Sequence, residues 1–286
     1  MGLAPWADRL GEPLGSPVRS VRALGGGCVA EVWRVDLRDG RAVVAKRDLA
    51  RPWVLSREAQ MLRYLVQATT LPTPEVHFEA PGLLVMELLP GRSGVGPAAQ
   101  GDAAEHLARL HSHSGPAFGF SHDTVLGGLP LENSWTDSWL EFFRDHRLEP
   151  FVRSAEEVGG LDRAMMRRLE MVVGQLDRWI DPMVRPSLIH GDIWSGNVLS
   201  EGSRVTGFID PAIYYADREM ELAFIEMFDT FGDAFWRRYG ELAPLDAEYR
   251  RSRRHLYVLI PILVHVRLFG ASYVSSLGRA LDALGV

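Results

Sequence analysis

The chain has 286 residues, of which 47% are hydrophobic and 24% are charged, and its formal net charge is −6. That composition excludes an intrinsically disordered protein and provides enough material for one large domain or two lobes. The acidic balance also argues against nucleic acid and anionic membrane partners, because long-range repulsion opposes both.

The first 90 residues follow a strand-like pattern of short β-branched runs broken by turns. Strands are predicted at residues 18–24, 29–37, 41–46, 75–78 and 83–89. Asp39 and Gly40 predict a hairpin turn, and residues 52–67 predict a helix. Residues 1–90 should therefore form a small lobe with an antiparallel sheet and one helix.

The pattern changes to that of helices after a short segment rich in glycine and proline, residues 90–94. Helices are predicted at residues 103–111, 135–152 and 161–180, with several more from residue 219 to the C-terminus. A β-hairpin over residues 188–210 interrupts them. We therefore expect an α+β fold of two lobes, residues 1–90 and 91–286, with a ligand cleft between them.

Cysteine content and hydropathy favour a cytoplasmic protein. Cys28 is the one cysteine, so no disulfide can form within the chain. The longest apolar run, residues 256–264, contains Pro261 and is much shorter than the ~20 residues that cross a membrane. The N-terminal residues also lack the basic and apolar layout of a signal peptide.

A glycine-rich segment follows the first predicted strand. Gly25, Gly27, Ala30 and Val32 have the spacing of the G-x-G-x-x-G-x-V loop that covers nucleotide phosphates, with alanine in the third glycine position. A dinucleotide-binding fold uses similar spacing but continues into a helix, whereas strands follow here. An ordinary hairpin turn explains the glycines more simply, so a phosphate-binding interpretation needs a partner residue.

That partner is Lys46, the single lysine among 31 basic side chains. It ends the run Val-Val-Ala-Lys at residues 43–46, which matches the kinase strand that points an ammonium at nucleotide phosphates. Glu58 lies on the inward stripe of the following helix, where a buried carboxylate needs a cation. Glu58 would pair with Lys46, or it would lie at the edge of the stripe and reach water.

One segment has the spacing of a phosphotransferase catalytic loop. Asp192 and Asn197 are five positions apart, as in protein kinases, where the aspartate accepts the proton of the attacking hydroxyl and the asparagine binds Mg²⁺. A hairpin turning at residues 201–203 would return Asp210 to the end where Asn197 lies, so that two oxygen ligands converge. Each residue alone is also common in turns, but together with Lys46 they indicate phosphoryl transfer.

These residues resemble the protein-kinase-like small-molecule phosphotransferases, and more narrowly the fructosamine (ketosamine-3-) kinase family. Residues 190–197, His-Gly-Asp-Ile-Trp-Ser-Gly-Asn, look like that family's H-G-D-L-W-S-G-N, with Ile193 in place of leucine. Aminoglycoside and choline kinases share the aspartate and asparagine but not usually the intervening Trp-Ser-Gly, so Trp194 discriminates between these families. The resemblance extends to residues 118–123, 135–150, 210–219 and 268–270, whereas residues 264–267 depart from the family's Asn-His-Leu-Asn.

The resemblance implies an enzyme that transfers the γ-phosphoryl group of ATP to the 3-hydroxyl of a fructosamine or ribulosamine. The resulting phosphate would be unstable, so that the amine is deglycated. ATP and Mg²⁺ are implied as cofactors, with Asp192 as the proton acceptor and Asn197 and Asp210 as metal ligands. Lys46, held by Glu58, would position the phosphates.

Further site residues follow from the same resemblance. The implied nucleotide-binding residues are Gly25, Gly26, Gly27, Lys46, Glu87, Leu88 and Leu89, the last three through backbone groups that meet the adenine. Trp194 would form an apolar wall for the ketosamine, or it would anchor the catalytic loop. We expect His111 to be a structural residue behind the catalytic loop.

Cys28 directly follows the glycines and is either a spectator or a redox-sensitive thiol. Some family members carry a cysteine in this loop that responds to oxidation. Backbone N–H groups of a loop favour a reactive thiolate, so an intermolecular disulfide is one hypothesis for this residue.

Two other interpretations stay open. The chain could phosphorylate an aminoglycoside, a choline-like alcohol or another sugar, or it could be a catalytically inactive kinase-like binding module. Such modules usually lose one of the residues Lys46, Asp192, Asn197 and Asp210, and all four are present. The sequence leaves the choice between a monomer and a homodimer open.

Overall fold

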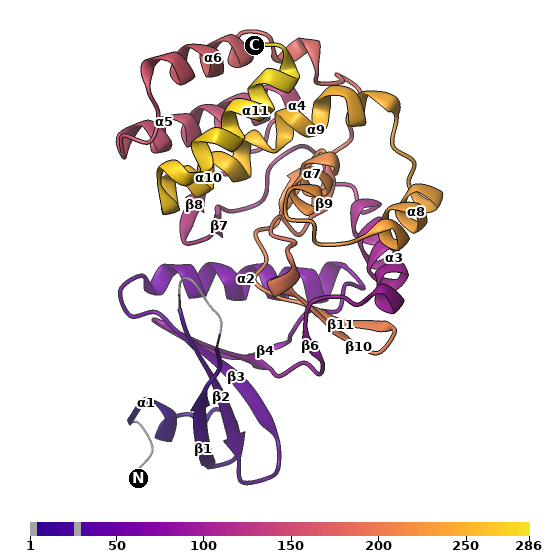
Figure 1. Cartoon of the computed structure of the whole chain (residues 1–286). Coiled ribbons are helices and arrows are strands. Elements are labelled where there is room, and N and C mark those ends of the chain that lie inside the picture. Colours follow the sequence, from indigo (N-terminus) through magenta and orange to yellow (C-terminus); the bar gives the residue numbers. More distant parts are fainter. Residues whose placement is uncertain (1–4, 26–29) are drawn as a thin grey trace.

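The computed structural model of the chain describes residues 5–25 and 30–286. Figure 1 shows a small sheet-rich lobe and a larger, mostly helical lobe, with helix α2 (Pro52–Ala68) lying between them. The predicted α+β fold of two lobes is confirmed. None of the helices in the two described ranges combines the length and the apolar character needed to cross a bilayer.

The small lobe is built on one antiparallel sheet. Its five strands lie in the order β1-β2-β3-β5-β4. Their bounds are β1 Val18–Ala23, β2 Glu31–Leu37, β3 Ala42–Arg47, β4 Val76–Ala80 and β5 Leu83–Glu87. A short helix, α1 (Pro5–Asp8), precedes them. Each predicted strand is present with small differences at its ends, although the predicted start of the second strand at residue 29 lies outside the described residues.

Side-chain alternation along β3 places Lys46 on the face of the sheet that α2 covers. Val43 and Ala45 pack in a hydrophobic cluster on one face, and Val44 packs in the cluster to which α2 contributes Leu55. Because successive side chains of a strand point to opposite faces, Lys46 shares the face of Val44. Lys46 is therefore buried even though it is charged.

Helix α2 carries one carboxylate into the interior. Pro52 occupies the first turn, where its missing N–H costs no hydrogen bond. The buried side chains of the helix are Val54, Leu55, Glu58, Ala59, Met61, Leu62 and Leu65. They recur at the spacing of one helical face, so the stripe that packs against the sheet and the larger lobe necessarily includes Glu58.

The larger lobe consists of helices around one continuous hydrophobic core, with short strands on the side of the small lobe. The helices are α3 Gln100–His111, α4 Trp139–Phe143, α5 Glu149–Glu157, α6 Arg163–Val173, α7 Glu219–Met227, α8 Asp233–Leu242, α9 Arg254–Tyr257, α10 Leu259–Phe269 and α11 Val274–Leu284. The strands are β6 Arg92–Ser93, β7 Thr124–Leu126, β8 Leu129–Leu131, β9 Ser187–Ile189, β10 Val198–Glu201, β11 Arg204–Phe208 and β12 Tyr214–Ala216.

The helix predicted over residues 135–152 begins later and ends later. The Ser138 hydroxyl accepts the backbone N–H of Glu141 and caps α4, which starts at Trp139. The chain then passes through a π-helical turn, Arg144–Leu148, directly into α5. A capping residue, which the apolar pattern alone does not reveal, therefore determines where this helix starts.

The helix predicted over residues 161–180 is shorter than expected. The Asp162 side chain caps its start, and α6 ends at Val173, next to Gly174. A 3₁₀ turn at Leu176–Arg178 follows. Glycine is a poor helix former, so the helix ends although the apolar spacing continues.

The hairpin predicted over residues 188–210 is two separate pairings. Strands β10 and β11 form the hairpin, with Val198 opposite Phe208. Strand β9 instead pairs with β12, which lies beyond Asp210 in the chain. A further hairpin, β7–β8, is not apparent from the sequence because each strand has three residues, too few for a clear alternation.

Candidate active site

Three of the predicted site residues meet between the lobes. The Nζ atom of Lys46 lies 2.6 Å from Oε1 of Glu58 and also forms a close ion pair with Oδ1 of Asp210. The Lys46 and Glu58 side chains are 7% and 10% exposed, whereas the Asp210 side chain is 39% exposed. We call Lys46, Glu58 and Asp210 the front cluster. Its members come from β3, from α2 and from the segment after β11.

The loop after β9 carries the other two predicted acid and amide residues. The Nδ2 group of Asn197 donates to both the backbone oxygen and Oδ2 of Asp192, each at 2.9 Å. Because the nitrogen makes both bonds, the amide oxygen is the atom of Asn197 suited to a metal. Gly191 has φ +85°, and a Cβ there would lie 2.3 Å from the oxygen of Ala212, so the loop requires glycine at this position.

The β10–β11 hairpin returns Asp210 to Asn197, as the spacing predicts. The backbone N–H of Ile209 donates to the oxygen of Asn197 at 3.0 Å. Asp210 itself has φ 56°, a left-handed conformation that aspartate tolerates better than most side chains. The sharp turn at Asp210 lies where the chain leaves the hairpin for β12.

Burial and mutual charge alter the protonation of this site. Burial raises the pKa of Asp192 to about 7, and the negative charge of Asp210 acts in the same direction, while the Asn197 hydrogen bond opposes it. Burial would lower the pKa of Lys46, but Asp210 and Glu58 together hold it above its ordinary value. Lys46 therefore stays a cation, and Asp192 has a pKa suited to accepting a proton near neutrality.

The oxygen atoms of the site suit a hard divalent cation. Asn197 and Asp210 offer amide and carboxylate oxygens, which Mg²⁺ prefers. Within residues 5–25 and 30–286, no group of three or more His, Cys, Asp or Glu side chains is arranged to hold a metal. A cation bound here would therefore take further oxygen ligands from phosphates and water, as Mg²⁺ commonly does.

The predicted glycine loop lies largely outside the described residues. Gly26, Gly27 and Cys28 fall in that gap, whereas Gly25 is described, and a Cβ on Gly25 would meet nothing within 4 Å. The strands on either side of the loop are β1 and β2, and β2 lies next to β3. The loop therefore begins and ends close to the strand that carries Lys46.

The predicted adenine-binding segment links the lobes. Glu87 ends β5, and Leu88 and Leu89 lead toward β6. The backbone N–H of Glu87 donates to the oxygen of Glu75 at 2.8 Å, and the Leu89 side chain packs so closely on Gly207 that a Cβ there would lie 2.2 Å from it. The contact of residues 87–89 with adenine stays a prediction.

Trp194 packs its ring over the catalytic loop and stays 39% exposed. A Cβ on Gly196 would lie 2.3 Å from the Cη2 atom of this ring, so glycine permits the close approach. The ring thus anchors the loop on one side and is open to solvent elsewhere. Both functions that the sequence suggests, an anchor and an apolar wall, are compatible with this arrangement.

Sequence reasoning missed Glu221, which supports the catalytic loop from behind. Its Oε1 accepts the N–H of Gly191 at 2.6 Å, and its Oε2 lies 2.8 Å from Nε2 of His111. The Nδ1 atom of His111 lies 2.7 Å from the Tyr239 hydroxyl. We call His111, Glu221 and Tyr239 the rear cluster. A glutamate inside the apolar run of α7 is the signal that could have identified it, because a buried carboxylate needs partners.

Comparison with known sequences identifies a family. A family model described as fructosamine kinase matches residues 6–285. A probable ketoamine kinase from Synechocystis sp. is 34% identical over 288 residues, which cover 94% of this chain and 93% of the relative. A chloroplastic protein-ribulosamine 3-kinase from Arabidopsis thaliana is 27% identical, with 96% of this chain and 85% of the relative covered.

Solved structures agree with this result. A crystal structure of a Thermobifida fusca protein assigned as a fructosamine-3-kinase has a TM-score of 0.89 and 32% identity, with 99% of both chains covered. A ternary complex of aminoglycoside phosphotransferase APH(4)-Ia with ADP and hygromycin B has a TM-score of 0.69 at 18% identity, with 98% of this chain and 99% of that chain covered. The second likeness concerns the fold alone, and together they confirm the predicted protein-kinase-like fold.

Proposed function

Because the chain belongs to the fructosamine kinase family, we propose that it transfers the γ-phosphoryl group of ATP to a sugar hydroxyl of a ketosamine. The observation that carries this proposal is the convergence of Lys46, Asp192, Asn197 and Asp210 from two lobes. In phosphoryl transfer the protein contributes mainly position and charge. One ammonium and several oxygen atoms at the junction of the lobes suit that task.

We propose distinct tasks for the residues of the site. Asp192 accepts the proton of the acceptor hydroxyl, whose oxygen then bonds to the γ-phosphorus as the bond to the β-phosphate oxygen breaks and ADP leaves. Lys46, held by Glu58, neutralises phosphate charge. Asn197 and Asp210 would hold Mg²⁺, which when bound neutralises the negative charge of the phosphates.

The lobes would divide the substrates between them. Residues 1–90 would bind ATP, with Gly25–Gly27 over the phosphates and residues 87–89 against the adenine. Residues 91–286 would bind the acceptor, with the exposed part of Trp194 as an apolar wall. A cytoplasmic location, which suits these substrates, stays a prediction.

The relatives guide the choice of acceptor. Their names point to ketoamines, fructosamine and ribulosamine. By the same likeness we propose the 3-hydroxyl as the site of transfer. The 3-phosphate would then decompose, so that the biological result is the removal of sugar from amines.

A panel of acceptors tests this proposal. Radiolabelled ATP with Mg²⁺ would be incubated with ribulosamine and fructosamine conjugates of small amines and of proteins. An aminoglycoside and choline would serve as alternative acceptors. We expect transfer to the ketosamines and none to the alternatives. Transfer only to an aminoglycoside or to choline would reject a ketosamine kinase.

The variant Asp192→Asn tests the role of the proposed proton acceptor. It keeps the size of the side chain and its hydrogen bond to Asn197, but it cannot accept the proton. We expect turnover to fall by about 10³-fold or more, since general base catalysis contributes 10²–10⁴-fold, while ATP still binds. Near-normal turnover would contradict the role of Asp192.

A further inference from the structure

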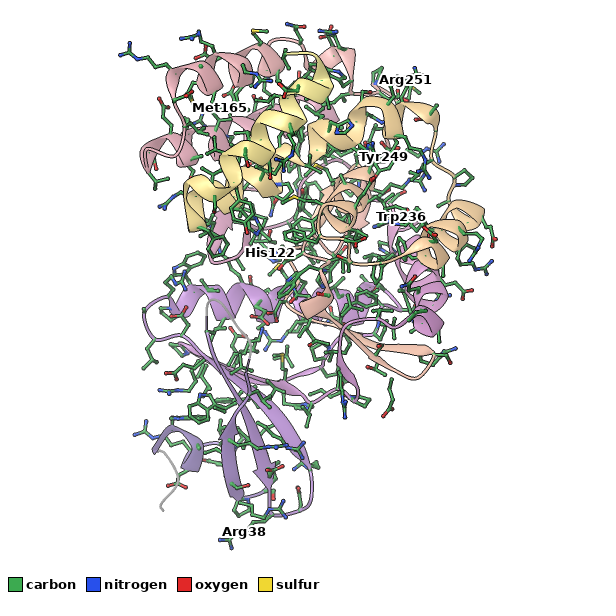
Figure 2. The ribbon with its side chains drawn as sticks, in the orientation of Figure 1. Arg38, His122, Met165, Trp236, Tyr249 and Arg251 are labelled. Carbon is green, nitrogen blue, oxygen red and sulfur yellow. The ribbon has the colours of Figure 1, made fainter. Side chains whose placement is uncertain are left out.

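Helix α2 is fastened to the larger lobe next to Glu58. The Nη1 group of Arg57 donates to the backbone oxygen of Thr124 at 3.1 Å, and its Nη2 lies 3.8 Å from a carboxylate oxygen of Asp123. The Arg57 side chain is 28% exposed. Figure 2 shows His122, which precedes these partners, at the boundary between α2 and the larger lobe. Arg57 thus reaches across the lobe boundary from the position before Glu58.

The partner of Arg57 belongs to a chain of buried polar groups. The Nδ2 group of Asn133 donates to Oγ1 of Thr124 at 2.8 Å, and the Nη2 group of Arg147 donates to Oδ1 of Asn133 at 2.5 Å. Thr124, Asn133 and Arg147 are 0%, 1% and 1% exposed. The guanidinium of Arg147 lies 3.9 Å from the centre of the Tyr214 ring. This series of buried polar contacts therefore connects α2 with strand β12.

Arg147 is a buried cation held by neutral groups. Its Nη1 donates to the backbone oxygens of Glu132 and His146 at 2.8 and 2.7 Å, and two aromatic rings lie against it. Among the described residues no carboxylate forms an ion pair with it. Burying such a charge is costly unless its donors have partners, so the acceptors of the two Nη groups are constrained in position, whereas Nε has no hydrogen-bond partner among the described residues.

A second contact between α2 and the larger lobe ends on the same strand. The Tyr64 hydroxyl lies 2.7 Å from the hydroxyl of Tyr215, which follows Tyr214 in β12. Strand β12 pairs with β9, where Tyr214 is opposite Ile189. Strand β9 leads directly into the loop of Asp192. The Tyr64 contact therefore ends beside the strand from which the catalytic loop emerges, and the Arg57 contact reaches the same strand pair indirectly, through the buried polar groups described above.

From this arrangement we propose that Arg57 is a positioning residue. It holds α2 against the larger lobe and so keeps the Glu58–Lys46 ion pair at a fixed position relative to Asp192. The proposal rests on the phosphotransferase function given above. Without the link, Val54, Met61 and Leu65 would still pack in the core of the larger lobe, but the turn of α2 that carries Glu58 would lose its polar contact with that lobe, and the Glu58–Lys46 pair would be held less precisely. A shift of about 1 Å at a reacting group can cost a large factor in rate.

The variant Arg57→Met tests this role, with Arg63→Met as the matched control. Arg63 lies on the same helix but forms its ion pair, at 2.6 Å, with Glu79 inside the small lobe. We expect Arg57→Met to lower kcat about tenfold with a smaller change in the KM for the acceptor. Arg57→Lys should restore part of the loss, and Arg63→Met should leave kcat within about twofold. Equal effects of Arg57→Met and Arg63→Met would reject the proposal.

A double-mutant cycle separates positioning from a general loss of stability. If Arg57 acts through Glu58, Arg57→Met should have little further effect on kcat in a Glu58→Gln background. Independent, multiplicative losses would overturn the proposal. If Arg57→Met does not fold, Tyr64→Phe takes its place in the test. It removes the hydroxyl contact with Tyr215 and keeps the aromatic ring, and we expect a smaller loss of kcat.

Hydrogen exchange provides a readout that needs no acceptor. We expect Arg57→Met to accelerate amide exchange in the first turns of α2 at least about tenfold relative to Arg63→Met, because these turns lose their polar contact with the larger lobe. Unchanged exchange would reject the positioning role. If wild-type protein transferred no phosphate to any ketosamine, the proposed acceptor would be wrong, whereas the exchange result would still test Arg57.

Discussion

The front and rear clusters are both charged and both contact the catalytic machinery, but they differ in exposure and in hydrogen bonding. In the front cluster the Asp210 side chain is 39% exposed and shares one ammonium with Glu58. In the rear cluster His111 and Glu221 are 1% and 0% exposed, and both oxygens of Glu221 have partners. The front cluster can therefore exchange partners with a ligand, whereas the rear cluster holds the loop in one position.

The two clusters also balance charge differently. In the front cluster, two carboxylates face one ammonium, and burial raises the pKa of Glu58 while Lys46 opposes that change. An uncompensated carboxylate near the surface attracts a cation, which suits a site for metal-bound phosphates. In the rear cluster the Glu221 carboxylate is hydrogen-bonded to the backbone N–H of Gly191 and to the His111 ring, and the Tyr239 hydroxyl contacts the other nitrogen of that ring. We therefore expect substitutions in the front cluster to reduce turnover more than stability, and substitutions in the rear cluster to reduce stability more than turnover.

Among substitutions in the two clusters, removal of the front ammonium should have the largest effect on activity. Lys46→Met leaves Glu58 and Asp210 without their shared cation. We expect kcat/KM for ATP to fall by about 10²-fold or more, the usual loss when one group that stabilises transition-state charge is removed. Steady-state kinetics with varied ATP would measure it. A loss below tenfold would show that Lys46 does not contact the phosphates.

The double variant Lys46→Met with Glu58→Gln separates activity from stability. Lys46→Met alone leaves a buried carboxylate unpaired, which is destabilising. Replacing that carboxylate by an amide should recover most of the unfolding free energy but none of the kcat/KM. Recovery of activity together with stability would mean that the loss came from unfolding and not from chemistry.

Removal of the rear carboxylate should affect stability by a few kcal/mol. Glu221→Ala leaves the Gly191 N–H and the His111 ring without their acceptor in a fully buried site. We expect a loss of about 3 kcal/mol in the free energy of unfolding, measured by urea denaturation. The control Glu226→Ala, on the same helix but with a 37% exposed side chain, should lose less than about 1 kcal/mol.

The sequence predicts the front cluster better than the rear one for a physical reason. Lys46, Asp192 and Asn197 each belong to a local pattern, a strand or a loop with characteristic spacing, and one hairpin brings Asp210 to them. The rear cluster joins residues that are 110 positions apart, His111 and Glu221. Their contact depends on how α3, α7 and α8 pack, and no local spacing encodes that packing.

The same limit applies to the pairing of strands and to the link at Arg57. Strand β9 pairs with β12 across the whole catalytic loop and hairpin, and each strand has three residues, too few for a periodic signal. Arg57 reads as an ordinary exposed arginine of an amphipathic helix until its partner, Thr124, is placed beside it. Local sequence patterns thus identify the candidate catalytic residues, whereas the residues that hold them in place become apparent only from the tertiary packing.

A buried acid near the rear cluster should make stability depend on pH. Asp217 accepts hydrogen bonds from the Tyr257 hydroxyl at 2.6 Å and the Glu219 N–H at 2.9 Å. Burial and the nearby Glu219 raise the pKa of Asp217 to about 6, and Arg253 opposes this. Because the folded pKa lies above the unfolded value, the contribution of this carboxyl to stability is complete below about pH 4 and is lost as the pH rises through about 6.

The variant Asp217→Asn removes that titration. The unfolding free energy of wild type relative to Asp217→Asn should decrease by roughly 1–3 kcal/mol between pH 4 and pH 7. Denaturation curves at several pH values would measure the difference. A difference that stays constant, or that grows with pH, would contradict the raised pKa.

The smallest expected effect concerns Trp194 and returns to the front of the site. A Cβ at Gly196 would lie 2.3 Å from the Trp194 ring, so Gly196→Ala should push the partly exposed ring outward without altering the front cluster. We expect the KM for the acceptor to rise about three- to tenfold, as for the loss of a modest apolar contact, with the KM for ATP and the unfolding free energy nearly unchanged. If kcat and stability fell while the KM for the acceptor did not change, Trp194 would be an anchor of the loop and not a wall for the substrate.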